Sequence, residues 1–470
     1  MAKERSPGFK LGLTIIIGAL LIIPLLMVYG LVWDRQSQSN TATSSVAAGW
    51  GGPQVLSGPV MVIPYREQSV ETVTENGKEK TRAIIVTKEL YLSPVRNSAD
   101  IVIDATEKRK SIYRPVVYTA KLDGKAQFAV PDDLDRYGID ADSLDYSKAE
   151  LRIGVSDARG LQAQNSVTVD GEAVALRSGK GLLASNNSGF HAFVDWSQKA
   201  GAPIDVSYIY SMRGNGRISL VPRAEQTLWN ISSKWPHPGF GGDFLPDDSN
   251  VSDEGFSASY SIANLALGQS IVQTEDLSPP QQYAASDYIS YPETRAANPG
   301  ISQAVQINLI QPVNLYNQVD RALKYGFLFI GFTFVSFLMF DIIGGARVAA
   351  AEYILTGAGL ILFFVLLLAF AELIGFAWAY LVAAAAIIGL VSAYSASILG
   401  SWRRAGFIAA LLAGLYALLY VLLNLEELAL IIGSVLLFFA LAAIMYVTRN
   451  VDWSGIGRKE EEEAAVKTQA

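Results

Sequence analysis

The sharpest local signal for chemistry in this 470-residue sequence is the hexapeptide WPHPGF at residues 235–240. Proline fixes φ on both sides of His237, so a rigid loop would present the imidazole ring. Trp235 and Phe240 would then be available to stack on a sugar or a peptide. The alternative is a structural corner, in which His237 bonds a backbone carbonyl and the two aromatic rings fill the core. We predict a candidate binding loop here, and both interpretations stay open.

A second candidate is the pair Asp157 and Arg159, which follows a strand-like run at residues 151–155. We favour a turn in which Asp157 accepts hydrogen bonds from backbone amides and Arg159 forms a forked ion pair. In a functional version, Arg159 would grip a carboxylate or phosphate through two parallel hydrogen bonds. An enzyme built on this pair would need His237 to share the same cleft.

Other catalytic and metal-binding patterns are scarce. The chain has no cysteine and only two histidines, which excludes thiolate ligands and a histidine-rich metal site. It contains no Gly-x-Ser-x-Gly elbow, and its 44 acidic residues are too many to nominate a carboxylate pair. A solvated loop is expected around four carboxylates whose spacing fits no EF-hand, namely Asp243, Asp247, Asp248 and Asp253. We therefore predict no cofactor, no bound metal and no enzymatic activity.

The distribution of charge predicts a chain that is part membrane and part globular. Charged residues make up 17% of the sequence, against roughly 25% in an ordinary soluble domain. Only ten charged residues occur from Lys324 to Arg449. Residues 11–33 carry no charge, and this length favours an uncleaved signal anchor, since a signal peptide has an apolar region of about 7–15 residues.

Five further uncharged stretches are candidate spans, at residues 325–340, 353–371, 373–402, 405–425 and 428–448. With the first span they make six, which places both termini on one side. The basic residues Arg347, Arg403, Arg404, Arg449, Arg458 and Lys459 all fall on that side, which the positive-inside rule makes cytoplasmic. We predict a cytoplasmic N-terminus (1–10), a first helix (11–33), a translocated β-rich domain (34–323), a bundle of five helices (324–448) and an acidic cytoplasmic tail (449–470).

Alternating apolar and polar residues dominate the translocated segment and predict nine short strands, at residues 60–65, 83–92, 113–122, 151–155, 206–210, 218–221, 228–231, 256–260 and 305–309. Four dipeptides are suited to hairpin turns, namely Asn76-Gly77, Asp123-Gly124, Asp170-Gly171 and Asn215-Gly216. So many strands at close spacing indicate a sandwich-like domain inserted between helix 1 and helix 2. Residues 39–52, rich in Ser, Thr, Ala and Gly, predict a linker leaving the membrane.

Three long motifs carry a resemblance to a known family: AELRIGVSDARGL at 149–161, SSKWPHPGFGGDFLPDDSNVSDEGFSASY at 232–260 and QPVNLYNQVDRALKYGFLFIGFTFVSFLMFD at 311–341. The chain resembles the CreD family of inner-membrane proteins over nearly its whole length. The resemblance implies a bacterial inner-membrane protein with a large periplasmic domain, linked to envelope integrity, a two-component response and envelope stress. It implies no reaction and supplies no catalytic residues.

We therefore expect a non-enzymatic, six-span α+β membrane protein whose periplasmic domain binds an envelope protein or glycan. One alternative is an envelope-modifying enzyme. Another is a bundle that handles lipid or solute, which would need a cavity near Thr356 or Ser392. The lipid bilayer is the expected partner, whereas a net charge of −7 without a long basic run argues against nucleic acid. The sequence specifies neither the ligand, the oligomeric state, the number of periplasmic subdomains nor a signalling route.

Overall fold

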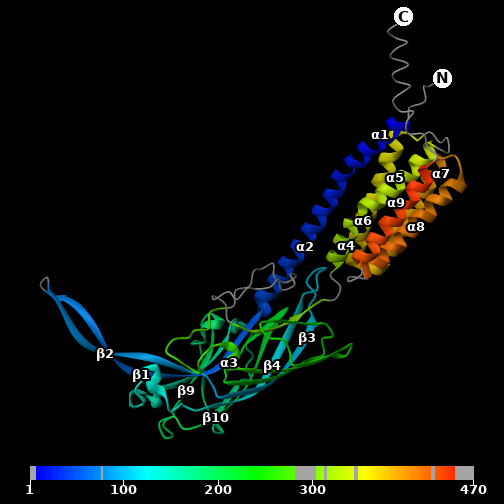
Figure 1. Cartoon of the computed structure of the whole chain (residues 1–470). Helices are drawn as coiled ribbons and strands as arrows, with labels where there is room; N and C mark the ends of the chain where they lie inside the picture. Colours follow the sequence, from blue (N-terminus) through cyan, green and yellow to red (C-terminus); the bar gives the residue numbers. More distant parts are fainter. Residues whose placement is uncertain are drawn as a thin grey trace, which may run out of the picture. The chain divides into compact units, whose positions relative to one another are not determined.

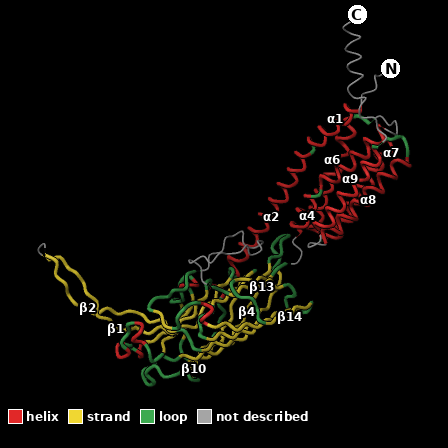
Figure 2. Tube along the Cα trace, in the orientation of Figure 1, coloured by secondary structure: helices red, strands yellow, loops and turns green. Residues whose placement is uncertain are grey.

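The computed structural model describes residues 7–75, 78–280, 303–311, 315–342, 348–424 and 429–449. The chain divides into two compact units, one formed by residues 1–39 and 313–470 and the other by residues 40–312. The first unit is helical and the second is rich in β-strands (Figure 2). The fold is therefore α+β with one large β-rich domain, as the sequence predicts. The described helices are α1 (Pro7–Leu20), α2 (Ile22–Trp50), α3 (Asn264–Leu267), α4 (Leu315–Lys324), α5 (Gly326–Ile342), α6 (Ala350–Ile374), α7 (Phe376–Ile398), α8 (Trp402–Asn424) and α9 (Ala429–Thr448).

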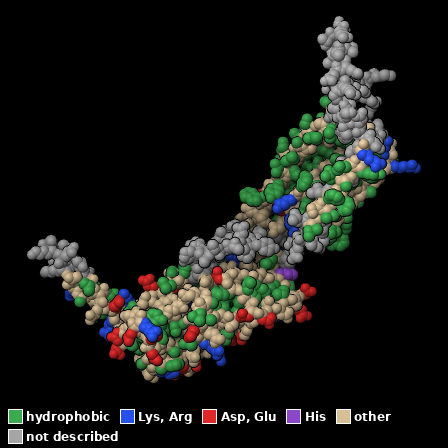
Figure 3. Space-filling model, in the orientation of Figure 1, with side chains coloured by type: hydrophobic (Ala, Val, Ile, Leu, Met, Phe, Trp, Pro, Cys, Tyr) green, Lys and Arg blue, Asp and Glu red, His purple; other side chains and the backbone are tan. Residues whose placement is uncertain are grey.

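The helical unit carries apolar side chains over much of its outer surface (Figure 3). Within the described residues, five segments are long and apolar enough to cross a membrane, namely Phe9–Trp50, Leu315–Ile342, Ala350–Ile374, Phe376–Ile398 and Trp402–Leu423. Helix α9 covers the sixth predicted stretch, and the count of six spans stays a prediction. Exposed apolar faces of this kind suit helices that lie against lipid.

Polar contacts hold opposite ends of the helical unit. The Lys10 ammonium lies 2.8 Å from the buried carboxylate of Asp341, which joins α1 to the end of α5. Glu372, near the end of α6, accepts a hydrogen bond of 3.1 Å from the Tyr316 hydroxyl and lies 3.9 Å from the Arg35 guanidinium. Such pairs fix how the helices align, because an unpaired charge in an apolar bundle is costly.

The β-rich unit is built from two sheets, with strands β1 (Gln54–Glu75), β2 (Lys78–Leu92), β3 (Arg96–Glu107), β4 (Val116–Phe128), β5 (Ala149–Val155), β6 (Ser166–Val169), β7 (Glu172–Ala173), β8 (Leu176–Ser178), β9 (Gly189–Val194), β10 (Ile204–Asn215), β11 (Arg217–Val221), β12 (Gln226–Ser233), β13 (Pro238–Gly242), β14 (Asp248–Ser252), β15 (Gly255–Ala263), β16 (Val272–Gln273) and β17 (Val305–Leu309). Among the described strands, sheet A has the order β13-β17-β11-β1-β5-β9-β8; in addition, β2 pairs with β1, and β16 pairs with β2. Sheet B has the order β14-β15-β12-β3-β4-β10-β6-β7.

The two sheets bury a shared hydrophobic core, to which strands of both contribute. Strand β1 lies inside sheet A, parallel to β11 and antiparallel to β5. Alternation along strands such as β4 places every second residue in this core. Farther out, β1 and β2 pair only with each other and leave the domain as a two-stranded arm (Figure 1).

All nine predicted strands coincide with or overlap observed strands, and Asp170-Gly171 forms a predicted hairpin turn, with φ of 50° and 88°, between β6 and β7. Asn76-Gly77 lies outside the described residues. The turn at Asp123-Gly124 is wrong, because both residues lie inside β4. A Cβ atom on Gly124 would lie 2.3 Å from the Tyr208 ring, so glycine is needed here for close approach. The hairpin at Asn215-Gly216 is also wrong, since this dipeptide carries the chain from sheet B to sheet A.

The predicted linker at residues 39–52 is wrong, because helix α2 continues to Trp50. The sequence between Ser39 and Trp50 is rich in Ser, Thr and Asn, which are weak helix formers. Tertiary contacts sustain helices of low propensity. Here Ser45, Ala48 and Trp50 all contact the β-rich domain, and these contacts explain why the segment is helical.

Candidate functional site

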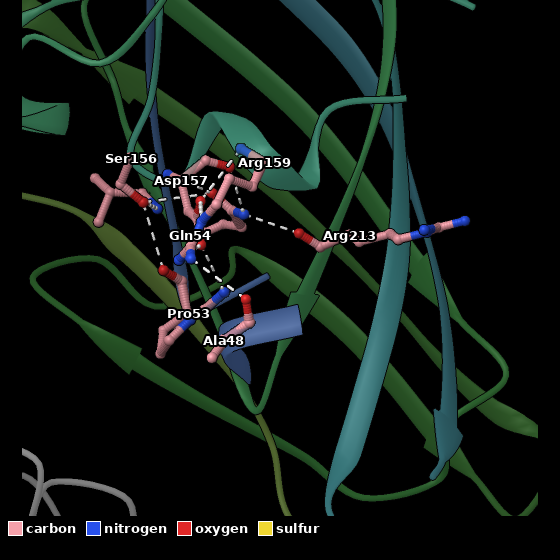
Figure 4. Close-up of polar contacts among 9 residues, drawn as sticks. Ala48, Pro53, Gln54, Ser156, Asp157, Arg159 and Arg213 are labelled. Carbon is pink, nitrogen blue, oxygen red and sulfur yellow. Dashed lines mark hydrogen bonds and ion pairs between the residues drawn. The ribbon is translucent and has the colours of Figure 1, made fainter. Parts of the chain in front are cut away.

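Asp157 and Arg159 lie where helix α2 passes into sheet A (Figure 4). The Asp157 carboxylate accepts hydrogen bonds from the backbone amides of Gly52, at 3.1 Å, and Arg159, at 3.2 Å. The Arg159 guanidinium donates two parallel hydrogen bonds of 2.8 Å to the same carboxylate. Its third contact, of 3.3 Å, is to the carbonyl of Ala48 in the last turn of α2. This is the turn with a forked ion pair that the sequence favours, and it ties α2 to the end of β5.

Gln54 forms the centre of the same junction and was missed by sequence reasoning. Its side-chain amide donates to the carbonyls of Asp157, at 3.2 Å, and Arg213, at 2.8 Å. Its oxygen accepts a hydrogen bond of 3.2 Å from the amide of Asp157. Gly160 allows this close packing, since a Cβ there would lie 2.3 Å from the Arg213 carbonyl oxygen. Arg213 lies 159 residues from Gln54, so no local pattern marks this contact.

Trp50 completes the junction, and it too gave no sequence signal. The Lys108 ammonium lies 3.7 Å from the centroid of its ring, and the Arg213 guanidinium carbon lies 4.4 Å from it. The indole N–H donates a hydrogen bond of 3.3 Å to the carbonyl of Tyr118. Cations attract the face of an indole ring. Contacts with Tyr118 of β4 and Arg213 of β10 therefore fix the last residue of α2 against sheet B.

We expect Asp157→Asn to loosen this junction. The hydrogen bonds from Arg159 hold the pKa of the Asp157 carboxyl below its ordinary value despite partial burial. A depressed folded-state pKa stabilises the fold above the unfolded pKa of about 3.9, and this contribution is lost as the pH falls through the folded-state pKa. Hydrogen exchange at Gly52 and Arg159 should therefore be about tenfold faster in the variant at pH 7, because charged hydrogen bonds contribute about 1.5–3 kcal/mol.

Mass spectrometry of the full chain in detergent would measure this exchange. The difference between parent and variant should begin to shrink as the pH falls below about 4 and should disappear below the lowered folded-state pKa, where the parent carboxylate is protonated too. Equal exchange of parent and variant at pH 7 would contradict the assigned role of the carboxylate.

The loop at residues 235–240 connects β12 to β13. The Trp235 indole N–H donates a hydrogen bond of 3.0 Å to the carbonyl of Ile310, whose own amide donates to the carbonyl of His237 at 3.1 Å. The Phe240 ring meets Phe256 edge to face, with centroids 5.6 Å apart. Both aromatic residues are half-buried, whereas His237 is exposed. The aromatic rings thus pack within the domain, and the imidazole is presented to solvent.

The structure does not bring His237 together with Asp157 and Arg159. Strand β13, which follows His237, is four positions from β5 in the order of sheet A. Neighbouring strands lie about 4.8 Å apart, so the two places are separated by about 19 Å. That distance is too large for groups that must share one reacting centre.

Sequence reasoning also missed an ionic cluster on sheet A, in which Arg152 and Glu150 are buried and Glu89 and Lys180 are partly exposed. Arg152 of β5 donates to Glu89 of β2, at 2.6 Å, and to Glu150, at 2.9 Å. Lys180 adds a second cation 2.6 Å from Glu150. Burial alone would raise the pKa of Glu89 and Glu150, but hydrogen bonds to Arg152 and the other partners lower both. Burial and the hydrogen bond to Glu89 raise the pKa of Tyr91 to about 12.

Comparison with known proteins identifies the family. The family model described as "Inner membrane protein CreD" matches residues 6–454. The chain belongs to the CreD family. It is also 30% identical over 461 residues to the inner membrane protein CreD of Escherichia coli (strain K12). The aligned region covers 96% of this chain and 94% of that protein. The resemblance that the three sequence motifs carry is confirmed.

In this CreD-family chain, the β-rich domain offers polar hollows more than deep clefts. One hollow of about 320 Å³ lies over β3, β12, β14 and β15, and its polar lining includes Asp100, Asn230, Asp248, Ser249, Asn250 and Ser257. Within the part of the chain that the structure describes, no group of three His, Cys, Asp or Glu residues is arranged to hold a metal ion. In the helical unit, the hydroxyls of Thr356 and Ser392 are shielded from solvent.

Proposed function

We propose that this CreD-family protein is a non-enzymatic inner-membrane protein that supports envelope integrity. Its β-rich domain binds an envelope protein or glycan on the periplasmic side of the membrane. The family resemblance supports the role in the envelope. Within the residues that the structure describes, the separation of His237 from Asp157 supports binding over catalysis.

The proposed topology has six spans, both termini in the cytoplasm and residues 34–323 in the periplasm. Two contacts support this topology. Lys10 of α1 pairs with Asp341 near the C-terminal end of α5, and Arg35 of α2 lies near Glu372 at the C-terminal end of α6. Lys10 and Arg35 are 25 residues apart along α1 and α2, which is about 38 Å of helix. That length exceeds the roughly 30 Å of a bilayer core, so the two pairs suit opposite membrane faces.

The observation that carries the binding proposal is the exposure of His237 on a fixed loop. Two prolines flank His237. The loop is bonded to the backbone of Ile310, whose carbonyl accepts from the Trp235 indole and whose amide donates to the His237 carbonyl. A ligand that hydrogen-bonds the imidazole would meet a preorganised group, and preorganisation reduces the entropy lost on binding.

A complementation experiment tests this proposal. In a strain lacking its CreD protein, His237→Ala at membrane abundance matched to the parent should fail to restore resistance to envelope-damaging agents. Asp253→Ala is the matched control, since Asp253 is also an exposed loop residue of the same domain, and it should restore resistance fully. Full restoration by His237→Ala would remove the loop from the proposed binding surface.

A further inference from the structure

The hollow of about 320 Å³ over β3, β12, β14 and β15, the sheet B hollow, carries charge of one sign. Its lining contains two carboxylates, of Asp100 and Asp248, and no basic side chain. The other polar side chains of the lining are amides and hydroxyls, namely Asn230, Ser232, Ser249, Asn250, Ser257 and Ser259. The sheet B hollow therefore offers a negatively charged surface with many groups that can form hydrogen bonds.

The strand register places the two carboxylates in one row across sheet B. Asp248 of β14 lies opposite Ser259 of β15. Ser259 lies opposite Asn230 of β12, which lies opposite Asp100 of β3. Residues directly opposite each other in neighbouring strands point to the same face of the sheet. Three strand spacings of about 4.8 Å separate the two ends of the row, which are thus about 14 Å apart.

Both carboxylates are accessible and neither is neutralised by a cation of the described chain. The Asp100 carboxylate accepts a hydrogen bond of 2.9 Å from the Asn230 amide, which is a neutral donor. Asp248 is exposed on β14, the last described strand at its edge of sheet B (Figure 2). Lys121 and Lys125 of β4 share this face, but they lie outside the lining of the sheet B hollow. A cationic group that enters the hollow can therefore pair with either carboxylate.

The spacing of the carboxylates favours an extended ligand over a single ion. A calcium ion binds oxygen atoms at about 2.3–2.6 Å, so carboxylates at the two ends of the row cannot share one. An extended polypeptide rises about 3.4 Å per residue, and alternate side chains point to the same side. Two basic residues four positions apart therefore lie about 14 Å apart on one side of such a chain. A neutral glycan is less suited, because the described lining of the sheet B hollow has no aromatic ring for stacking.

We propose that the sheet B hollow is a docking site for an extended protein segment with two basic residues four positions apart. The two basic side chains pair with Asp100 and Asp248. A small polar residue midway between them lies over Ser259 and Asn230. One exposed ion pair contributes little by itself, but a single segment that forms both pairs gains from their linkage. The proposal rests on the proposed function only for the compartment in which the partner is found.

Photochemical cross-linking of a peptide to the full chain in detergent tests the proposal. The probe is a biotin-labelled heptapeptide with lysine at its second and sixth positions, a diazirine analogue of alanine at its fourth position and serine elsewhere. Mass spectrometry should locate the cross-links in residues 228–232 and 248–259. An isomer with the two lysines adjacent has the same charge and composition, and it should cross-link at least about threefold less because it cannot reach both carboxylates. High salt should weaken the cross-linking of both peptides.

Substitution of the carboxylates assigns the charge. Asp100→Asn and Asp248→Asn should each lower the cross-linking of the spaced peptide about threefold, and the double variant should lower it about tenfold. Asp104→Asn is the matched control, because Asp104 is an exposed carboxylate of β3 outside the lining of the sheet B hollow. This control should cross-link as the parent does. Unchanged hydrogen exchange of amides 255–263 in every variant would show that sheet B stays folded.

Three results would overturn the proposal. The first is equal cross-linking of the two peptide isomers, and the second is equal cross-linking of the parent and the double variant. The third is competition by a neutral chitin tetrasaccharide as strong as that by unlabelled peptide, which would make a glycan the ligand. The assay uses the purified chain with His237 intact, so its failure is distinguishable from failure of the complementation experiment.

Discussion

Arg152→Ala should lower the free energy of opening of strand β5 by about 3–5 kcal/mol, the usual cost of removing one partner from a buried ion pair. The substitution leaves Glu150 buried with only Lys180, and it removes the two hydrogen bonds that Arg152 donates to Glu89, which keeps its hydrogen bond from Tyr91. Hydrogen exchange of amides 149–155 in the full chain should accelerate a hundredfold or more. Arg152→Lys should give an intermediate result, because an ammonium keeps the charge but cannot reproduce the fork.

The pH dependence of this effect has a defined sign. The lowered pKa values of Glu89 and Glu150 mean that their contribution to stability is present above the ordinary carboxyl pKa, about 4.3, and is lost as the pH falls through the folded-state values. The difference between parent and Arg152→Ala should therefore shrink below about pH 4. Arg66→Ala, at an exposed position of β1, is the control and should change exchange little. Equal effects of the two alanine variants would show that the cluster does not stabilise sheet A.

Trp50→Ala should release the last turns of α2 from the β-rich domain. The substitution removes a half-buried ring, two cation contacts and the hydrogen bond to Tyr118. Burial of the ring and each cation contact contribute about 1.5–3 and about 0.5–1 kcal/mol respectively. Because residues 40–50 have low helix propensity, we expect their amides to exchange about 30- to 100-fold faster, which corresponds to about 2–3 kcal/mol.

Trp50→Phe separates the ring from its N–H group and should produce a smaller acceleration. Exchange at residues 149–155 serves as the internal control, since the ionic cluster does not contact Trp50. If residues 40–50 exchange equally in the parent and in Trp50→Ala, then the indole does not sustain this part of the helix, and the explanation given for the missing linker is wrong.

Strand positions could be predicted where the apolar residues alternate, as in β5 and β10. Strand β13 was missed because Pro238 and three glycines argue against a strand. The structure tolerates them, since among the described strands β13 pairs only with β17, at an edge of sheet A. Strand β14 was missed because all its residues are exposed and it therefore lacks an alternating pattern.

In the candidate site, too, local contacts could be predicted from the sequence and distant contacts could not. Asp157 and Arg159 are two residues apart, so the geometry of their turn could be predicted from local chemistry. The partners of Gln54 and Arg152 are far away in the chain, with Glu89 at 63 residues from Arg152. Tertiary folding alone brings such pairs together. The sequence also gave no sign that a polar segment would be helical, because the stabilising groups come from strands β4, β5 and β10.

The position of β1 inside sheet A has a consequence for the order in which the domain is made. Strand β1 is synthesised first, yet its neighbour β11 begins at Arg217, and β17, which separates β11 from β13, ends at Leu309. Closure of such distant pairs is slow, and unpaired edges favour aggregation. A nascent chain that stops before Val305 leaves β11 and β13 each with an open edge. Sheet A therefore gains β17 only after its other long strands have been made, so its closure is a late folding step and the earlier strands keep open edges until then.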